Sequence, residues 1–441
     1  IRTSFPKPFV LAGARPGFLP PAGGCATIGL QGRRTRGATA HGRRTAHEIM
    51  DKELRADIAS GCGLTCGDGA AGTPTQQPLP EEYGNLTAKE TAARIARAKA
   101  LLGPRVVILG HHYQRDDIIR FVDYTGDSLK LAQLSASRGD AEYVVFCGVH
   151  FMAESADILG ASRQRIILPH MGAGCPMADM ATRPQVEALW QFLSEVTDTP
   201  GIPVTYVNSS AAIKAFCGER GGATSTSSNC QQVFAWALER SDRIVFFPDE
   251  HLGRNSALAM GFCEDDLAVW DPLARPTDAT ARALSGSRFI LWKGYCPVHA
   301  RFSVEQIERA RREHPGVRVL VHPECRHEVV EAADGAGSTE QIIRAVNESE
   351  PGTNFALGTE VNLVNRLAEE HPDRVIFCLD PIVSPCSTMY RIHPAYLCWA
   401  LENLAQGRIV NEIVVPEADI TGARAALERM LALSQPGAAP R

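Results

Sequence analysis

The sequence predicts a parallel α/β protein built from three similar units that face a common centre. Two observations lead to this prediction. From about residue 81 onward, short apolar runs alternate with helical stretches, which is typical of parallel α/β proteins. The same order of features also recurs three times along the chain: a polar strand end, a hydroxyl turn and a cysteine. Such a repeat indicates structural triplication.

Each unit is expected to begin with a strand that ends in polar residues. These strands are predicted at 106–110 (followed by His111), at 204–208 (ending in Asn208) and at 319–324 (containing His322 and Glu324). A helix follows each of them, and a second strand is predicted at 143–147, 243–247 and 374–378. Ligands bind at the carboxyl ends of strands in open parallel sheets, so we expect the polar ends to line a site.

A hydroxyl residue is expected to open a helix in each unit, namely Ser128, Ser227 and Thr339. These residues lie 17, 19 and 17 positions after His111, Asn208 and His322, respectively. A helix N-terminus offers unpaired N–H groups and the positive end of the helix dipole, which suits carboxylate or phosphate. Ordinary N-capping would explain any one of the three. Their recurrence at matched positions favours anion binding.

One cysteine in a Gly/Pro turn closes each unit, namely Cys175, Cys296 and Cys386. The hydroxyl residue and the cysteine are 47 residues apart in the first and third units and 69 in the second. We expect the loops that carry these thiols to converge. Three thiolates suit an iron–sulfur cluster or zinc, with a fourth coordination position left open.

Acid–base residues gather at the same predicted strand ends, namely His111, His112, Tyr113, His322 and Glu324. Beside three metal-ligand cysteines, such a group indicates a functional site for a small, strongly anionic substrate. Glu324 is expected to transfer protons, with a pKa raised by the anionic substrate and by partial burial. The alternative is that Glu324 only orients His322 or caps a helix.

Composition narrows the classes of function. The chain has 441 residues, a net charge of -5 and no apolar run near the ~20 residues needed to span a membrane. Neither nucleic acid nor a membrane is therefore expected as a partner. The 13 cysteines are scattered and odd in number, which favours a reduced, cytoplasmic protein over a disulfide scaffold.

Residues 1–80 are predicted to be a disordered or non-native N-terminal extension. The first 46 residues are rich in arginine and contain no acid, since Glu48 is the first acidic residue. An organelle transit peptide is the alternative interpretation of such a segment. Cys62 and Cys66 lie in a Gly-rich patch of this extension and are interpreted as unstructured thiols.

The folded part is predicted to comprise three domains, at 81–185, 186–300 and 301–441, the last with a C-terminal helix and tail. Thr87 and Glu90 have the spacing of a capping box. They are expected to open the first helix of the first domain, which should run to about Leu102.

Several short motifs fall in one order along residues 101–405. They are His111-His112-Tyr113-Gln114, Gly126-Asp127-Ser128-Leu129, Gly148-Val149-His150-Phe151-Met152-Ala153-Glu154-Ser155-Ala156, Tyr206-Val207-Asn208-Ser209-Ser210-Ala211, Thr226-Ser227-Ser228-Asn229, Pro248-Asp249-Glu250-His251-Leu252-Gly253, Lys293-Gly294-Tyr295-Cys296-Pro297-Val298-His299, His322-Pro323-Glu324-Cys325 and Gly337-Ser338-Thr339. In this order and spacing they resemble the quinolinate synthase family, in its longer bacterial subtype.

The resemblance implies three similar three-layer αβα domains with short parallel sheets, arranged around a pseudo-threefold axis. It implies one [4Fe–4S] cluster per chain, held by Cys175, Cys296 and Cys386. The catalytic residues expected on this basis are Tyr113, Glu324 and His111. The expected substrate-binding residues are His111, Ser128, Tyr206, Val207, Asn208, Ser227, His322, Pro323, Glu324 and Thr339.

The resemblance also implies an enzyme that condenses iminosuccinate with dihydroxyacetone phosphate to quinolinate. Phosphate and two waters would be released, in the de novo biosynthesis of NAD. The open iron of the cluster would act as a Lewis acid. Expected partners are the iron–sulfur assembly machinery and L-aspartate oxidase, as supplier of iminosuccinate. The chain is expected to be a monomer or a homodimer.

Two alternatives come from other classes of protein. A non-catalytic iron–sulfur sensor or electron carrier would ordinarily use four cysteines, and it would not need the hydroxyl and His-Pro-Glu positions. A structural zinc protein would prefer close pairs of ligands. In this chain, Cys296 lies 121 residues after Cys175 and 90 residues before Cys386.

Overall fold

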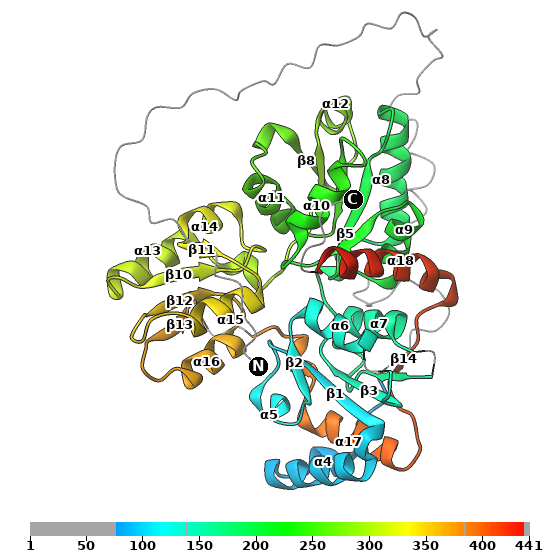
Figure 1. Cartoon of the computed structure of the whole chain (residues 1–441), viewed down its shortest axis with the longest axis vertical. Helices are drawn as coiled ribbons and strands as arrows, with labels where there is room; N and C mark the ends of the chain where they lie inside the picture. The colour runs from blue at the N-terminus through cyan, green and yellow to red at the C-terminus, as the bar shows by residue number, and fades with distance from the viewer. Residues whose placement is uncertain (1–75, 138, 162, 383–384, 436–441) are drawn as a thin grey trace, which may run out of the picture. The chain divides into compact units, whose positions relative to one another are not determined.

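The computed structural model of the protein describes residues 76–435 except for positions 138, 162 and 383–384. The described chain forms three separate sheets, with helices between successive strands (Figure 1). Neighbouring strands are parallel in all three sheets, apart from one short C-terminal strand. The predicted α/β class is therefore confirmed. The interpretation of residues 1–75, including Cys62 and Cys66, lies outside the described residues.

The first sheet has the strand order β14-β4-β3-β1-β2. Its strands are β1 (Val106–His111), β2 (Tyr124–Gly126), β3 (Tyr143–Cys147), β4 (Arg165–Ile167) and β14 (Glu412–Ile413). Its part of the chain also forms α3 (Glu81–Gly84), α4 (Ala88–Leu102), η1 (Gly103–Arg105), α5 (Asp116–Ile119), α6 (Ser128–Ser137) and α7 (His150–Leu159). All residues of β1 and β3 are buried, which explains why they read as continuous apolar runs.

The second sheet has the order β6-β5-β7-β9-β8 and is parallel throughout. Its strands are β5 (Ile202–Tyr206), β6 (Ala223–Ser225), β7 (Ile244–Phe247), β8 (Leu267–Trp270) and β9 (Phe289–Trp292). The helices of this region are α8 (Arg183–Val196), α9 (Ala211–Glu219), α10 (Cys230–Leu238), α11 (Glu250–Ala259), η3 (Glu264–Asp266) and α12 (Asp278–Gly286).

The third sheet has the order β11-β10-β12-β13 and is also parallel. Its strands are β10 (Arg318–Val321), β11 (Gly335–Ala336), β12 (Phe355–Gly358) and β13 (Ile376–Cys378). Its helices are α13 (Val304–Glu313), α14 (His327–Ala332), α15 (Thr339–Asn347) and α16 (Val361–Glu370). In each of the three sheets, the first strand of the unit lies between a short edge strand and the second strand.

The second strand of the third unit was predicted wrongly. The strand that pairs with β10 is β12, just as β3 pairs with β1 and β7 pairs with β5. The predicted strand at 374–378 corresponds to β13, the next strand along, which is equivalent to β4 and β9. β12 is only four residues long and contains Ala356 and Gly358, which are weak strand formers, so its pattern is faint.

The end of the chain returns to the first and second sheets. α17 (Pro394–Ala405) packs against α4 (Figure 1). β14 pairs antiparallel with β4. α18 (Glu417–Leu433) then packs against α9 and β6. We retain the three predicted regions as proposed domains. The pairing of β14 with β4 shows that a strand from the third region forms one edge of the first sheet.

The predicted capping box at the start of α4 is confirmed. The Thr87 hydroxyl accepts a hydrogen bond from the Glu90 backbone N–H at 3.2 Å, and the Thr87 N–H donates to the Glu90 carboxylate at 2.9 Å. Both bonds satisfy N–H groups that the first turn of a helix leaves unpaired. The helix ends at Leu102, as expected. Of the helices in the described ranges, none is both long and apolar enough to cross a membrane.

Candidate active site

A cavity of about 280 Å³ is lined by loops from all three sheets. Its lining includes most of the residues singled out from the sequence: His111, Tyr113, Ser128, Cys175, Tyr206, Asn208, Ser227, Cys296, His322, Glu324, Thr339 and Cys386. Two predicted substrate contacts, Val207 and Pro323, are neighbours of lining residues in the chain but do not line the cavity. The polar strand ends, the hydroxyl turns and the cysteines thus meet in one place.

The three cysteine loops share one local structure. Each loop follows an equivalent strand, β4, β9 or β13, and enters a 3₁₀ turn that begins three residues after the cysteine. These turns are η2 (Ala178–Met180), η4 (His299–Arg301) and η5 (Met389–Arg391). In each loop the cysteine carbonyl accepts a hydrogen bond from the N–H four residues later, at 3.2, 2.9 and 2.9 Å. The repeat predicted from the sequence therefore extends to the backbone around each thiol.

The three thiols are free and partly buried. Burial raises the pKa of Cys175, Cys296 and Cys386, and repulsion from neighbouring sulfurs raises those of Cys175 and Cys296 further. Thiolates at these positions therefore need a positive charge beside them. The residues present fit a thiophilic metal centre, because a cation would supply that charge and thiolates are its preferred ligands.

The helix starts are capped by residues next to the predicted hydroxyls. Asp127 accepts a hydrogen bond from the Lys130 N–H at 2.9 Å, and Ser338 accepts one from the Gln341 N–H at 3.4 Å. Ser128 and Thr339 are the first residues of their helices, so their hydroxyls are not needed as caps and line the cavity.

Ser227 does not open a helix as predicted. It lies in a turn three residues before α10 begins, and it still lines the cavity. Its neighbour Ser228 connects the three hydroxyl turns. The Ser228 hydroxyl lies 3.0 Å from a carboxylate oxygen of Asp127 and 2.9 Å from the hydroxyl of Ser338. This contact between the three units could not be read from local sequence patterns.

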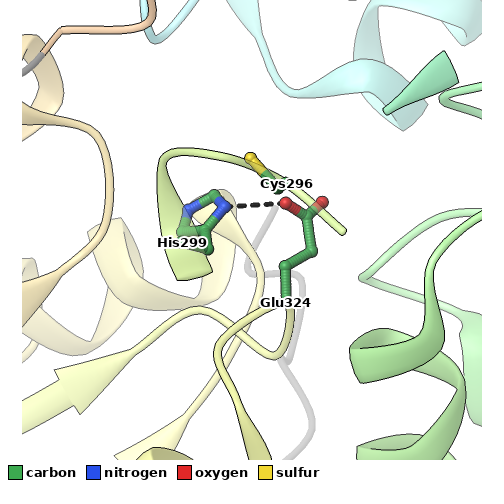
Figure 2. Close-up of side chains that lie close together, drawn as sticks. All are labelled: Cys296, His299 and Glu324. Atoms are coloured by element: carbon green, nitrogen blue, oxygen red, sulfur yellow. Dashed lines mark hydrogen bonds and ion pairs between the residues drawn. The ribbon is translucent and has the colours of Figure 1, made fainter. Parts of the chain in front are cut away.

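Glu324 lies at the centre of a buried hydrogen-bond network. The Tyr206 hydroxyl donates a hydrogen bond to Glu324 Oε1 at 2.5 Å. Nδ1 of His299 lies 2.7 Å from Glu324 Oε2 (Figure 2). The ring of His299 stacks on that of His322 with a centroid distance of 4.4 Å. Figure 2 also shows the Cys296 sulfur beside this carboxylate–imidazole pair.

The expectation of a raised pKa at Glu324 is wrong for the protein without substrate. Burial alone would raise the pKa, but the imidazoles of His322 and His299 and the hydrogen bonds from His299 and Tyr206 outweigh it. Together they hold the pKa of Glu324 well below its usual range. The carboxylate is therefore ionised at neutral pH. The Glu324 carboxylate contacts the His299 ring closely. The backbone N–H of Glu324 also donates a hydrogen bond to Nδ1 of His322, at 3.3 Å.

A second hydrogen-bond chain runs from Tyr113 to His299. The Tyr113 hydroxyl lies 3.0 Å from the hydroxyls of both Thr339 and Thr359, and Nε2 of His299 lies 3.5 Å from Thr359 Oγ1. Burial raises the pKa of Tyr113 well above its ordinary value, so its hydroxyl keeps its proton at neutral pH. No role was predicted for Thr359 or His299 from the sequence. His299 is the last residue of the motif that contains Cys296. Thr359 directly follows β12, the strand that was not predicted.

The histidines of the cavity are not a source of fixed positive charge. Burial and repulsion from His112 lower the pKa of His111 to about 3, and burial lowers that of His322 to about 3. Both imidazoles are neutral at pH 7 and act through hydrogen bonds. Among the lining residues that the structure describes, Arg301 is the permanent cation, and one of its guanidinium nitrogens lies 2.8 Å from Asp380.

Comparison with known proteins places the chain in a family. The model of the family described as "Quinolinate synthetase A protein" matches residues 93–432. A protein named quinolinate synthase from Corynebacterium glutamicum is 52% identical over 364 residues, which cover 82% of this chain and 92% of the relative. Quinolinate synthase of Geobacillus kaustophilus is 53% identical over 356 residues, covering 81% of this chain and 97% of the relative. That of Acidobacterium capsulatum is 52% identical over 355 residues, covering 80% and 95%. The chain therefore belongs to the quinolinate synthase family of enzymes.

Proposed function

We propose that the chain condenses iminosuccinate with dihydroxyacetone phosphate to quinolinate, releasing phosphate and two waters, in NAD biosynthesis. One observation carries the proposal. A single cavity joins three free thiols to hydroxyl, imidazole and carboxylate groups from three different sheets. Curated relatives that are about half identical to this chain, and that match it over 92% and 97% of their own length, are named for the same product.

Cys175, Cys296 and Cys386 are proposed to hold one [4Fe–4S] cluster per chain. Three sulfur donors leave one iron without a protein ligand. The spacing of the thiols supports a cluster over a single ion. A zinc ion with Zn–S bonds of about 2.3 Å draws its sulfurs to within about 4 Å of one another. Among the described residues, the three cysteines do not form a group that tight. When bound, the cluster would supply a Lewis-acidic iron to substrate oxygen.

The remaining lining residues suit a small anionic substrate. The hydroxyls of Ser128, Ser227 and Thr339 are proposed to hydrogen-bond carboxylate or phosphate oxygens. The neutral imidazole of His111 can donate one further bond. Asn208 supplies an acceptor, because its buried side-chain oxygen has no partner among the described residues. A substrate N–H or O–H would satisfy that oxygen, whose burial without a partner is otherwise costly.

Proton transfer is proposed to use the two hydrogen-bond chains. Glu324 is proposed as the proton acceptor, with Tyr206 and His299 holding its two oxygens in place. Tyr113 is proposed as the proton donor, with Thr359 linking its hydroxyl to His299. Dehydration and ring closure need both a base and an acid, so these groups are the proposed pair.

An anaerobic assay tests the proposed function. The full-length chain would be purified and reconstituted under argon, its iron and sulfide counted, and both substrates added. We expect a brown protein with about four irons per chain that forms quinolinate. A brown protein that forms no quinolinate would favour an iron–sulfur sensor or electron carrier. A protein that takes up no iron even after bound zinc has been removed with a chelator, and that rebinds one zinc ion, would favour a structural zinc protein.

The cellular context belongs to the same proposal. The substrate iminosuccinate is proposed to come from L-aspartate oxidase, and the cluster from the iron–sulfur assembly machinery. The protein is also proposed to be cytoplasmic and to be a monomer or a homodimer. Size-exclusion chromatography with light scattering, and fractionation of the source cells, would test these two points directly.

A further inference from the structure

We propose that the chain without its cluster has a second metal site, in which Cys296, His299 and Glu324 hold a single Zn²⁺ ion. The site shares one ligand with the proposed cluster and uses neither Cys175 nor Cys386. It does not depend on the proposed reaction, because it rests on three side chains that lie together in the structure.

The three side chains offer one sulfur, one nitrogen and one oxygen donor. These ligand atoms all lie within 4.8 Å of one another (Figure 2). Small movements of the side chains would bring them to the bond lengths of about 2.0–2.3 Å that zinc forms with such donors. Three protein ligands with a fourth position open to the cavity are typical of catalytic zinc sites.

The backbone holds two of the ligands in one turn. Cys296 and His299 are three residues apart, and the Ala300 N–H donates to the Cys296 carbonyl at 2.9 Å. The third ligand, Glu324, comes from the strand end of the third sheet and already lies 2.7 Å from Nδ1 of His299. A metal ion would take the place of the proton between these two groups, and the neutral imidazole would then carry its proton on Nε2, the ring nitrogen that faces Thr359.

Outer contacts orient the ligands as they do in metal sites. Tyr206 donates to the Glu324 oxygen that does not face His299, at 2.5 Å. Thr359 Oγ1 lies 3.5 Å from the ring nitrogen of His299 that does not face Glu324. Metal-binding histidines and carboxylates commonly have such partners, which fix the ring and the carboxylate for coordination.

The charges of the site also balance. Zn²⁺ with one thiolate and one carboxylate is electrically neutral, which suits a buried location because isolated charge is costly there. His299 and Glu324 are almost fully buried, with side-chain exposures of 2% and 4%. Binding would displace the thiol proton of Cys296 to solvent, since the thiolate is the form that coordinates zinc.

The shared ligand makes the two metals mutually exclusive. A zinc ion on Cys296 would leave only Cys175 and Cys386 for the cluster. Zinc bound before cluster assembly is therefore expected to block reconstitution, and a chelator is expected to restore it. The Glu324 carboxylate would be occupied by the same ion, so the zinc form is expected to be inactive.

Metal titration of the cluster-free, full-length chain under argon tests the proposal. All proteins would carry Cys62→Ser and Cys66→Ser, because these two thiols are close in sequence and could bind zinc themselves. Zn²⁺ would be titrated by calorimetry and Co²⁺ by absorption. We expect one equivalent of each, and a thiolate-to-cobalt charge-transfer band. Circular dichroism of each variant would check folding.

Variants separate this site from the cluster site. Cys296→Ser, His299→Gln and Glu324→Gln are each expected to weaken zinc binding by roughly 100-fold or more, since losing even an outer partner costs 10–100-fold. Cys175→Ser and Cys386→Ser are the matched controls and are expected to bind zinc normally, although neither should hold a cluster. A Cys175→Ser protein that binds zinc but holds no cluster would support the zinc site independently of the cluster. The two proposals can therefore succeed or fail separately.

Three results would overturn the inference. The first is the absence of a stoichiometric zinc or cobalt site. The second is a loss of zinc affinity in Cys175→Ser or Cys386→Ser that is as large as the loss in Cys296→Ser. That result would place the ion on the three cysteines. The third is undiminished binding in Glu324→Gln, the variant that changes size least, which would place the ion elsewhere.

Discussion

The side-chain amide nitrogen of Asn255 lies 2.8 Å from the backbone oxygen of Cys325, and it lies equally close to that of Pro323. The amide oxygen of Asn255 lies 2.9 Å from Nδ1 of His327. Asn255 belongs to α11 of the second sheet, whereas the turn that carries Glu324 follows β10 of the third. One buried amide from the second region of the chain therefore fixes the carboxylate-bearing turn of the third.

Asn255→Ala is expected to lower turnover by about 10- to 100-fold, because small misplacements of a reacting group are costly. Iron content should stay unchanged, since Asn255 contacts none of the three cysteine loops in the hydrogen bonds of the described chain. Asn347→Ala is the matched control, because Asn347 contacts His371 at 2.8 Å on the surface.

A double-mutant cycle separates positioning from general damage. If Asn255 acts through Glu324, Asn255→Ala should cost much less turnover in a Glu324→Gln background than in the wild type. Fully additive losses would show that Asn255 acts in some other way.

Glu324→Gln is expected to lower single-turnover formation of quinolinate by roughly 10²-fold or more, the usual scale for losing a general acid or base. The change keeps the size of the side chain but removes the ionised carboxylate between His299 and Tyr206. We expect substrate binding to stay within about tenfold, because neutral hydrogen bonds remain. Glu340→Gln is the control, since Glu340 also pairs with a histidine, His112, at 2.9 Å. Near-normal turnover of Glu324→Gln would leave Glu324 only a structural role.

Cys175→Ala, Cys296→Ala and Cys386→Ala are each expected to abolish iron binding and activity together, because two thiolates cannot hold four irons securely. Iron and sulfide analysis after anaerobic reconstitution measures this. Cys378→Ala is the matched control, since Cys378 lies on β13 shortly before the Cys386 loop but does not line the cavity. A fully loaded, active Cys296→Ala protein would refute the ligand assignment.

Lys214 gives a pH-dependent prediction. Its ammonium group is fully buried, donates to the Ser209 carbonyl at 2.5 Å, and lies 5.5 Å from the ring centroid of Phe151. Burial lowers the pKa of Lys214 to about 8, below the ordinary value of 10.5. Between these two pH values the unfolded chain binds more protons than the folded chain. The free energy of unfolding should therefore rise with pH across this window, by about 3 kcal/mol from this group.

Denaturant unfolding of wild type and Lys214→Met at several pH values measures this effect. The difference in unfolding free energy, wild type minus variant, should rise from pH 8 to pH 10.5 and be flat below pH 8. Lys130→Met, at a half-exposed side chain, is the matched control. A difference that stays constant with pH would mean that Lys214 titrates alike in the folded and unfolded chain.

Local patterns were enough to predict the strand ends and the cysteine turns. Both depend on residues within a few positions of each other, such as the buried run of β1 before His111. The repeat then indicated that these features share a centre. The cavity that joins Cys175, Cys296 and Cys386 agrees with that arrangement.

The features that were missed depend on contacts between distant parts of the chain. Besides burial and the nearby His322, the pKa of Glu324 depends on His299, which lies 25 residues earlier, and on Tyr206, which lies 118 residues earlier. Thr359 was missed because the short β12 gave too weak a strand pattern to show where its polar end lies. A sequence shows that Glu324 is a carboxylate, but not which groups donate to it.

The convergence of three cysteine loops has a consequence for how the molecule unfolds. The loops follow β4, β9 and β13, so a metal cluster on them would act as a cross-link between segments 121 and 90 residues apart. Bringing such distant segments together in the unfolded chain costs conformational entropy. In the folded chain the segments are already held together. A metal cluster that binds only the folded form would add its binding free energy to the stability of all three sheets together. The loaded chain should therefore melt in one sharp transition, whereas chelation should let the sheets melt separately and over a wider range of temperature.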